Sequence, residues 1–269
     1  MNGSTVDCGG HNQEFAGLAG TGAILAGLTA ADTLAFTGDA NFAGFTSLPA
    51  SGTILIRSIG NASAQRDLAF TAGAAAFNHL ALWPLPAAFP ARIAVSGTAL
   101  TVNGNLTLVD EKSAGSGILD FRPGNTAVTV AGTLASKENG AAANTLQLRM
   151  GNGKWTAKGN VALILPAGLA ADASTLDLAS PVAQSVTAGT ATLGTVTHTG
   201  AGTASLQSGL PLLAAGLAQS AGSFNLNGSN VDVSGAISVS NGGAASLQGL
   251  AGREIELFRL EDQLRARNS

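Results

Sequence analysis

Three short lines of the same form follow one another in the middle of the chain. In each line, apolar residues occupy every second position, and a glycine falls in phase with them. The lines are Leu100-x-Val102-x-Gly104-x-Leu106, Val128-x-Val130-x-Gly132-x-Leu134 and Trp155-x-Ala157-x-Gly159-x-Val161. Period-two alternation predicts a strand with one buried face. The in-phase glycine predicts a bend, or a stacking contact too tight for a Cβ atom.

The spacing of these glycines indicates a solenoid. Gly132 follows Gly104 by 28 residues (132 − 104), and Gly159 follows Gly132 by 27 (159 − 132). A near-constant period in this range is typical of proteins in which each repeat forms one coil stacked on the next. A fourth line, Val231-x-Val233-x-Gly235-x-Ile237, lies 76 residues beyond Gly159 (235 − 159), which leaves room for about three such coils. We expect an all-β, parallel β-helix with two strands in each coil, followed by a short C-terminal α-helix.

The composition suits narrow coils with thin cores. Glycine accounts for 36 of 269 residues, about twice the usual share, and charged residues for 11%, against a usual figure of about 25%. Aromatic residues account for 4% and tyrosine is absent. This argues against a sugar-binding or base-stacking surface, since both usually rely on aromatic rings. The net charge of −3, without a basic block before the C-terminus, argues against nucleic-acid binding.

Several absences in the sequence bear on its cellular setting. Cys8 is the only cysteine, so a disulfide framework and a cysteine-based zinc site are not expected. No apolar run reaches the roughly 18–20 residues that a membrane helix needs. The first residues, Met1 to Ser4, lack the basic region and apolar core of a secretory signal. We therefore expect no membrane span, and either assembly from the cytosol or a leader that has been removed.

We expect four segments along the chain. Residues 1–31 predict an N-terminal cap or docking segment, because a solenoid has to cover the strand edges at its ends. Residues 32–92 predict an N-terminal β domain that ends in a Pro/Trp-rich elbow. Residues 93–249 carry the solenoid repeats, with a short helix at 209–221 on the side of the stack. Residues 250–269 carry the C-terminal helix.

The elbow concentrates prolines and large apolar residues between His79 and Pro90. Proline interrupts the hydrogen-bond ladder of a sheet, so we interpret this stretch as a loop. An exposed loop containing Trp83, Leu85 and Phe89 would be a candidate partner site. The alternative is a buried plug between two domains.

The last segment differs in kind from the rest. Residues Arg253 to Arg267 contain no glycine or proline and are rich in strong helix formers. The apolar residues of the expected helix fall on two neighbouring faces, Leu257, Leu260 and Leu264 on one and Ile255 and Phe258 on the other. We predict that one face packs on the protein itself and the other on a sister subunit or a larger scaffold. The alternative is a helix that only caps the final coil.

Two charged triplets recur 27 residues apart (137 − 110), Asp110-Glu111-Lys112 and Lys137-Glu138-Asn139. A glycosidase could use paired carboxylates of this kind. In a solenoid, however, the spacing places both triplets on the same turn of successive coils, as is typical of solvated loops. We favour the second interpretation.

The other reactive residues do not combine into a site. Cys8-Gly-Gly-His11 has the spacing of half a zinc site, but a second pair of ligands is missing. Gly151-Asn152-Gly153-Lys154 is followed by Trp155, where a phosphate loop needs Ser or Thr. His79 and His198 have no acidic neighbour in sequence to orient them for catalysis. We expect no catalytic, cofactor-binding or metal-binding residues.

One stretch resembles a known repeat. Residues 33–44 read TLAFTGDANFAG and residues 51–56 read SGTILI. They are similar to the autotransporter-associated β-strand repeat, whose form is roughly T-L-x-L-x-G-x-N-x-[FY]-x-G followed by G-T-L-x-[LIV]. A second, partial echo runs from Gly117 to Leu134. The resemblance implies a right-handed parallel β-helix, as in bacterial surface passengers and some phage fibres.

These observations lead to a functional expectation. We expect a non-catalytic structural protein of a virion or extracellular assembly, such as a phage fibre, a spike for host attachment or a capsid-decorating protein. The alternatives are a bacterial surface adhesin or matrix filament, located extracellularly or at the cell surface, and a carbohydrate-active β-helix enzyme. The expected partners are further copies of the chain, as a homotrimer, and a larger capsid, tail or cell-surface scaffold.

Overall fold

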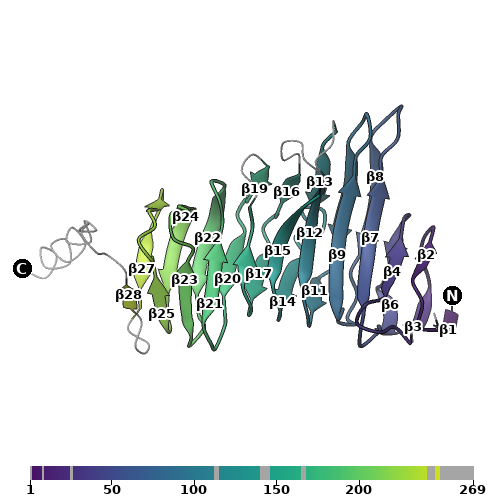
Figure 1. Cartoon of the computed structure of the whole chain (residues 1–269), viewed down its shortest axis with the longest axis horizontal. Coiled ribbons are helices and arrows are strands. Elements are labelled where there is room, and N and C mark those ends of the chain that lie inside the picture. Colours follow the sequence, from purple (N-terminus) through teal and green to yellow (C-terminus); the bar gives the residue numbers. More distant parts are fainter. Residues whose placement is uncertain are drawn as a thin grey trace, which may run out of the picture.

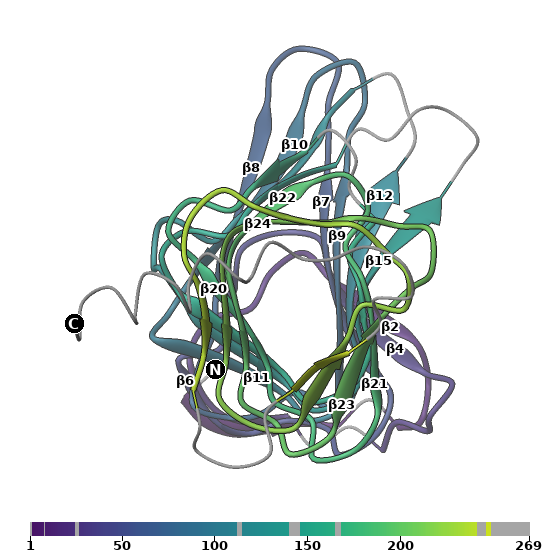
Figure 2. The ribbon, with the colours of Figure 1, turned by 90° about the vertical axis from the view of Figure 1, so that its left-hand side faces the viewer.

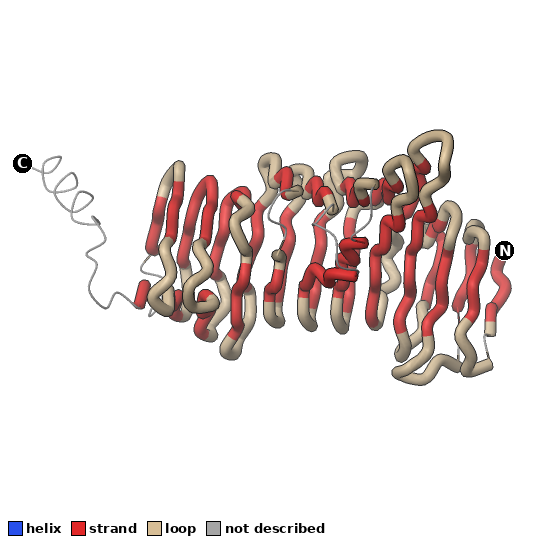
Figure 3. The backbone as a smooth tube through the Cα atoms, turned by 45° about the horizontal axis from the view of Figure 1, so that its top comes forward, coloured by secondary structure: helices blue, strands red, loops and turns tan. Residues whose placement is uncertain are grey.

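The computed structural model describes residues 2–7, 9–24, 27–111, 115–139, 146–164, 168–240 and 246–248. Within these residues every regular element is a β-strand, and no helix there is long and apolar enough to cross a membrane (Figure 3). The strands lie side by side along the longest axis of the molecule (Figure 1). Viewed along that axis, the coils wind around a common centre (Figure 2). The predicted all-β solenoid is therefore confirmed.

Four sheets of parallel strands form the walls of the solenoid. The eleven-stranded sheet contains β2 (Gln13–Phe15), β4 (Thr33–Phe36), β7 (Thr53–Ile59), β9 (His79–Leu85), β12 (Leu106–Glu111), β15 (Leu134–Asn139), β18 (Val161–Ala162), β21 (Gln184–Thr187), β23 (Thr203–Leu206), β25 (Ser223–Asn225) and β28 (Ser246–Gln248). The eight-stranded sheet contains β11 (Ala99–Val102), β14 (Ala127–Val130), β17 (Lys154–Ala157), β20 (Thr175–Leu178), β22 (Thr192–His198), β24 (Leu212–Gln219), β26 (Val231–Val233) and β27 (Ile237–Val239).

The two smaller sheets occupy the N-terminal part of the stack. The six-stranded sheet contains β5 (Ala40–Asn41), β8 (Arg66–Thr71), β10 (Ala91–Ser96), β13 (Gly117–Asp120), β16 (Gln147–Arg149) and β19 (Leu169–Ala170). The three-stranded sheet contains β1 (Asn2–Val6), β3 (Thr21–Ile24) and β6 (Gly44–Ser47). Apart from β26 and β27, strands that follow one another in the chain fall in different sheets, and neighbours within a sheet lie one coil apart, as stacked coils require.

The core consists of rows of inward-facing side chains that run along the stack. One row in the eleven-stranded sheet passes in register through eight strands, and each of its side chains is at most 3% exposed. Its members are Leu34, Ile54, Leu80, Leu106, Leu134, Val161, Val186 and Leu206. At the N-terminal end, buried phenylalanine rings fill the wider coils, with Phe42 and Phe77 centroids 5.1 Å apart. Each coil thus hides its apolar face only because its neighbours cover it.

The in-phase glycines lie above one another where the chain turns out of the eight-stranded sheet. Gly132 donates its backbone N–H to the carbonyl oxygen of Gly104 at 2.9 Å. A Cβ atom on Gly132 would lie 2.6 Å from the carbonyl carbon of Gly104, and one on Gly159 would meet the carbonyl oxygen of Gly132. The prediction that stacking leaves no room for a side chain at these positions is confirmed.

The coils shorten towards the C-terminus, which the glycine period did not predict. In the eight-stranded sheet the offset between paired residues is 28 for Leu100 and Val128 but 20 for Leu176 and Val196. Four coil steps, from β17 to β26, therefore separate the third line from the fourth, rather than three. The reason is that the six-stranded sheet ends at β19, so later coils omit one wall. The longer coils carry three strands each rather than the two expected.

The prediction of a Pro/Trp-rich elbow is wrong, because His79–Leu85 forms β9 in the middle of the eleven-stranded sheet. This strand pairs with β7 over its whole length but with β12 only from Leu80 to Leu82. Pro84 lies beyond the second ladder, so its missing N–H does not interrupt that ladder. The sheets continue through residues 92 and 93 without a break, and no loop or plug separates two domains there.

The helix expected at 209–221 is also wrong, since Leu212–Gln219 forms β24. Its alanines and leucines favour helix locally, but pairing with β22 on one side and with β26 and β27 on the other decides the outcome. Residues 2–24, expected as a cap, supply β1, β2 and β3 to the same sheets as later strands. The C-terminal helix at 250–269 lies outside the described residues.

A histidine side chain is buried inside the solenoid. His198 pairs in register with Leu178 and Gln219 and is 1% exposed. Its Nδ1 has no hydrogen-bond partner among the described residues, and its ring lies 6.1 Å from that of Phe224. Burial lowers the pKa of His198, and the neighbouring Asp177 carboxylate opposes part of this effect. The imidazole is therefore held neutral in the folded protein.

The glycine stack predicts the outcome of a pair of substitutions. Gly132→Ala should lower the free energy of unfolding by about 1–3 kcal/mol, because the new methyl group overlaps the backbone of Gly104. Gly216→Ala is the control, since its Cβ would have only ordinary contacts of 3.4 Å or more, and should change stability by less than about 0.5 kcal/mol. Urea unfolding measures both, and equal midpoints would contradict the stacking argument.

The buried histidine predicts a pH dependence of stability. Unfolded histidine has a pKa of about 6.5, while the pKa of folded His198 is lower, so the unfolded state binds more protons as the pH falls through that value. Stability should decrease from pH 7 to pH 5. In His198→Leu this decrease should be smaller, whereas substituting the half-buried His79 by Gln should leave it in place. A thermal melt series across this pH range tests the assignment, and an unchanged slope in His198→Leu would contradict it.

Candidate functional site

A groove of about 360 Å³ crosses the outer face of the eleven-stranded sheet. It runs over β4, β7, β9, β12 and β15, which are five successive coils of the stack. The residues that line it are Thr33, Thr53, Leu55, Ala81, Trp83, Thr107, Val109, Lys137 and Asn139. The groove therefore combines one aromatic ring, aliphatic side chains, three hydroxyl groups, an amide and an amine.

Register explains why the sheet is hollowed at this point. Ala81 pairs with Leu55 on one side and with Thr107 on the other, which makes a row of side chains smaller than Trp83 across three strands. The larger Trp83 stands two residues further along β9, on the same face, because side chains alternate along a strand. The row of smaller residues forms the floor of the groove, and Trp83 forms part of its wall.

Trp83 is held in place by two charged neighbours. The guanidinium of Arg57, its register partner on β7, lies 5.7 Å from the centre of the indole ring. The indole Nε1–H donates a hydrogen bond to Oε2 of Glu111 at 3.1 Å. Arg57 in turn donates to Oε2 of Glu14 at 2.6 Å. These contacts restrict the ring without removing it from the lining of the groove.

The two charged triplets meet at the far end of the groove, on β12 and β15. Asp110 pairs in register with Glu138, and Glu111 with Asn139, so the described triplet residues lie in successive coils as predicted. They lie on strands rather than on a turn, and their register is one residue longer than the 27-residue spacing. Asn139 donates its amide N–H to Oε2 of Glu111 at 2.7 Å. Asp110 departs from the expected solvated loop, since it is 1% exposed and accepts a hydrogen bond from the Leu146 backbone N–H at 3.0 Å.

The three residues of the candidate partner loop lie on two different elements, a strand and the segment that follows it. Trp83 and Leu85 lie on the outer face of β9, where Leu85 pairs with Ile59 of β7. Phe89 lies between β9 and β10 and is 41% exposed. Of these three residues only Trp83 lines the groove. The anchor residues Leu257, Leu260, Leu264, Ile255 and Phe258 lie outside the described residues.

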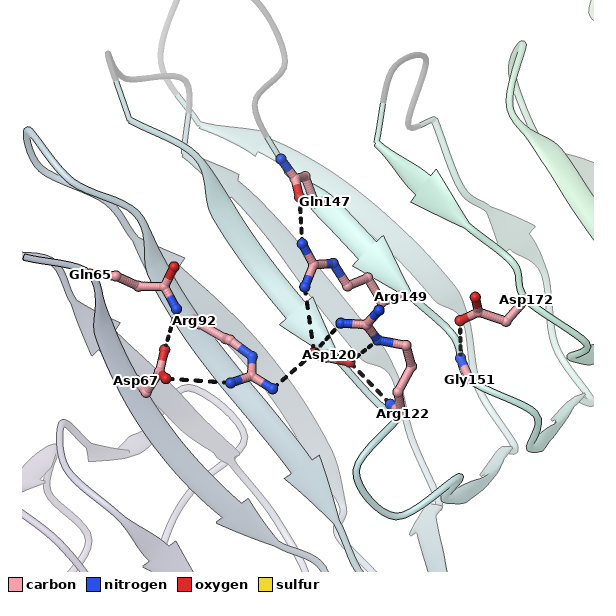
Figure 4. A network of polar contacts seen from close by, with 9 residues as sticks. All are labelled: Gln65, Asp67, Arg92, Asp120, Arg122, Gln147, Arg149, Gly151 and Asp172. Atoms are coloured by element: carbon pink, nitrogen blue, oxygen red, sulfur yellow. Dashed lines mark hydrogen bonds and ion pairs between the residues drawn. The ribbon is translucent and has the colours of Figure 1, made fainter.

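A second polar cluster lies on the outer face of the six-stranded sheet, around Asp120 (Figure 4). Asp120 is 1% exposed because three arginines cover it. Arg122 donates to both carboxylate oxygens, from Nε at 2.9 Å and from Nη2 at 2.8 Å. Arg92 donates from Nη2 at 2.9 Å, and Nη1 of Arg149 lies 3.6 Å away. Arg92 also contacts Asp67 of the preceding coil at 3.4 Å, so the cluster joins β8, β10, β13 and β16.

This cluster suits a structural role better than proton transfer. Burial raises the pKa of Asp120, but hydrogen bonds from Arg122 and Arg92 outweigh that effect and hold the pKa well below its usual range. A carboxyl group in this state remains ionised and does not supply a proton near neutral pH. The same contacts raise the pKa of Arg122, so both partners remain charged.

The described part of the chain contains no cluster of metal-ligating side chains. No three His, Cys, Asp or Glu residues there lie close enough together to hold an ion. Cys8 lies outside the described residues, so the half-site that it would form with His11 is not tested. His79 accepts a hydrogen bond on Nδ1 from the Asn105 backbone N–H at 2.8 Å. Lys154, from the stretch compared with a phosphate loop, forms an ion pair with Asp177 at 2.7 Å.

The Asp120 cluster is not among the predicted sites, although the sequence contains a signal for it. Asp120 pairs in register with Arg149, 29 residues later (149 − 120), and Arg92 precedes it by 28 (120 − 92). Opposite charges separated by one solenoid period therefore pointed to a contact between coils. The groove had no such signal, because the residues of its floor, Leu55, Ala81 and Thr107, form no distinctive pattern in the sequence.

The cluster predicts a difference between two aspartates. Asp120→Asn should lower the free energy of unfolding at pH 7 by about 2 kcal/mol, because several charge-assisted hydrogen bonds are lost. Asp67→Asn, at a 54% exposed side chain with one ion pair, should cost less than about 0.5 kcal/mol. Because the folded pKa of Asp120 is depressed, its contribution should persist down to about pH 4 and fade below that. Denaturant titrations at pH 7, 5 and 3 test this, and similar costs for the two variants would contradict it.

A comparison of the chain with models of known protein families, with characterised proteins and with solved structures finds no match. The function has to be inferred from the residues and their geometry.

Proposed function

We propose that this protein is a non-catalytic structural component of a virion or extracellular assembly, in the manner of a fibre, spike or capsid-decorating protein. The observation that carries the proposal is the uninterrupted stack. Rows of buried side chains continue through as many as eight coils in register. A solenoid of this kind is a stiff rod whose length is set by the number of its repeats.

The outer surface supports the same role. Charged side chains on the six-stranded sheet are used to join successive coils, as the contacts of Arg92 with Asp67 and Asp120 illustrate. Lys154 and Asp177 make a similar contact between β17 and β20. Ion pairs that link neighbouring coils resist sliding and bending of the rod, which is useful to a spacer or fibre.

Assembly is the second part of the proposal. Charged residues make up 11% of the chain, and proteins of such low charge tend to associate. Exposed apolar side chains on the described surface include Ile59 at 38% and Phe89 at 41%. We take a homotrimer as the assembled state, with the segment from Arg253 to Arg267 as the anchor to a sister subunit or a larger scaffold.

Immunogold labelling tests the location. Antibodies against the folded chain should label purified virus particles from the source organism, at regular positions on the capsid or tail. Labelling of intact cells without particles would instead support a surface adhesin or matrix filament. Labelling confined to the cell interior, in sections of permeabilised cells, would contradict both.

Truncation tests the anchor. A chain ending at residue 252, and the milder double variant Leu257→Ala/Leu264→Ala, should keep the β-sheet spectrum and the melting temperature but lose trimer formation and incorporation. Light scattering at micromolar concentration should give three times the chain mass of 26.4 kDa for the unmodified protein. A monodisperse monomer, or assembly that survives truncation, would overturn the anchor.

A further inference from the structure

We propose that the groove on the outer face of the eleven-stranded sheet binds a short, uncharged saccharide, with Trp83 as the ring on which a sugar packs. The proposal goes beyond the structural role and does not depend on whether the protein belongs to a virion. It rests on the shape of the groove, on the chemistry of its lining and on the occupants that this lining disfavours.

The shape suits a small elongated molecule. The lining residues come from five neighbouring strands, and strands in a sheet lie about 4.8 Å apart, so the groove extends for about 19 Å along the stack. Its volume of about 360 Å³ lies within the range of about 300–1,000 Å³ that is usual for small-molecule sites. A flat sheet surface would offer no such enclosure.

The lining combines the two kinds of contact that a sugar needs. A sugar presents apolar C–H faces and a rim of hydroxyl groups, and the face of an indole ring packs well against apolar surfaces. Around Trp83 the groove offers the hydroxyls of Thr53 and Thr107, the amide of Asn139 and the amine of Lys137. Hydroxyls and amides both donate and accept hydrogen bonds, as do the hydroxyl groups of a sugar. A single well-placed ring is enough for one sugar unit, even though aromatic residues are scarce in the chain.

The ring is held in position before a ligand arrives. Arg57 lies over the indole and Glu111 accepts its N–H, while Asn139 donates to the same carboxylate oxygen. Three strands therefore contribute to the position of one side chain. Binding would not have to order Trp83, and the entropic cost of association is correspondingly smaller.

Other occupants fit less well. A peptide strand cannot extend the sheet here, because the central strand β9 is paired on both sides, with β7 and β12, and strand addition needs an open edge. A strongly anionic or cationic ligand would find charges of both signs, from Lys137 in the lining and from Glu111 beside Trp83. A second copy of the chain would need a broad, flat apolar face, whereas this surface is hollowed and carries polar side chains among its apolar ones.

The two tryptophans allow the site to be observed directly. Trp155 is fully buried against Phe121, with ring centroids 4.6 Å apart, so a ligand on the outer surface should affect only the emission of Trp83. The full-length protein is titrated with cellotriose, maltotriose, tri-N-acetylchitotriose and raffinose, with triglutamate and spermine as charged comparators. Isothermal titration calorimetry provides the affinities independently of fluorescence.

Two substitutions and a matched control locate the binding. Thr107→Leu fills the floor of the groove, and Trp83→Ala removes the ring. Each substitution should lower the affinity for the tightest-binding saccharide by about tenfold or more, as expected for the loss of a ring-stacking contact. Thr129→Leu, at a half-buried outward position of β14, should leave the affinity unchanged. Circular dichroism shows that each variant is folded.

The expected result is a change in Trp83 emission with at least one saccharide, which is lost in Thr107→Leu and retained in Thr129→Leu. The proposal is overturned if no saccharide in the panel binds, or if a charged comparator binds more tightly than all of them. It is also overturned if Thr107→Leu binds as well as the unmodified protein, or if that substitution changes the oligomeric mass instead of saccharide affinity.

Discussion

The structure depends on the in-register stacking of parallel coils, about 4.8 Å apart. At this distance a residue in one coil always has the equivalent residues of the next coils as neighbours. An apolar side chain is covered most completely where the positions above and below it are apolar too. The row that includes Leu80, Leu106 and Leu134 satisfies this condition. At the corners the same closeness excludes side chains, and glycine at 104, 132 and 159 follows directly.

The same constraint shapes the outer surface, where charged residues also meet from coil to coil. Like charges in adjacent coils would repel each other at close range, whereas opposite charges attract. On the six-stranded sheet, Asp120 is accordingly surrounded by arginines from its own and neighbouring coils. On the eleven-stranded sheet, a row of smaller side chains next to a larger one produces a groove instead. The ion-pair cluster and the groove thus both arise from the stacking of coils. Which of the two forms depends on the side chains at equivalent positions of successive coils.

The sequence predicts those features of the structure that arise from residue patterns repeated in successive coils. The alternating lines and their glycines predict the strands, the stacking and the placement of the charged triplets in successive coils. The prolines near Trp83 predict a loop that the structure does not have, because the cost of Pro84 depends on where the ladder with β12 ends. The groove could not be predicted, because its floor is defined by small residues such as Ala81 and Thr107, whose register emerges only when the coils are stacked.

The shortening of the coils links the architecture to the placement of the sites. Coils with three walls enclose a wider interior, which the phenylalanines around Phe42 fill. Beyond β19 one wall is absent, the coils are shorter, and polar side chains such as His198 and Gln219 enter the interior. Both the groove and the Asp120 cluster lie on the wide, well-packed coils. A rigid aromatic wall such as Trp83 needs that support, because a side chain is positioned only as firmly as the strand beneath it. The wide part of the rod is therefore the part on which a binding surface can be built.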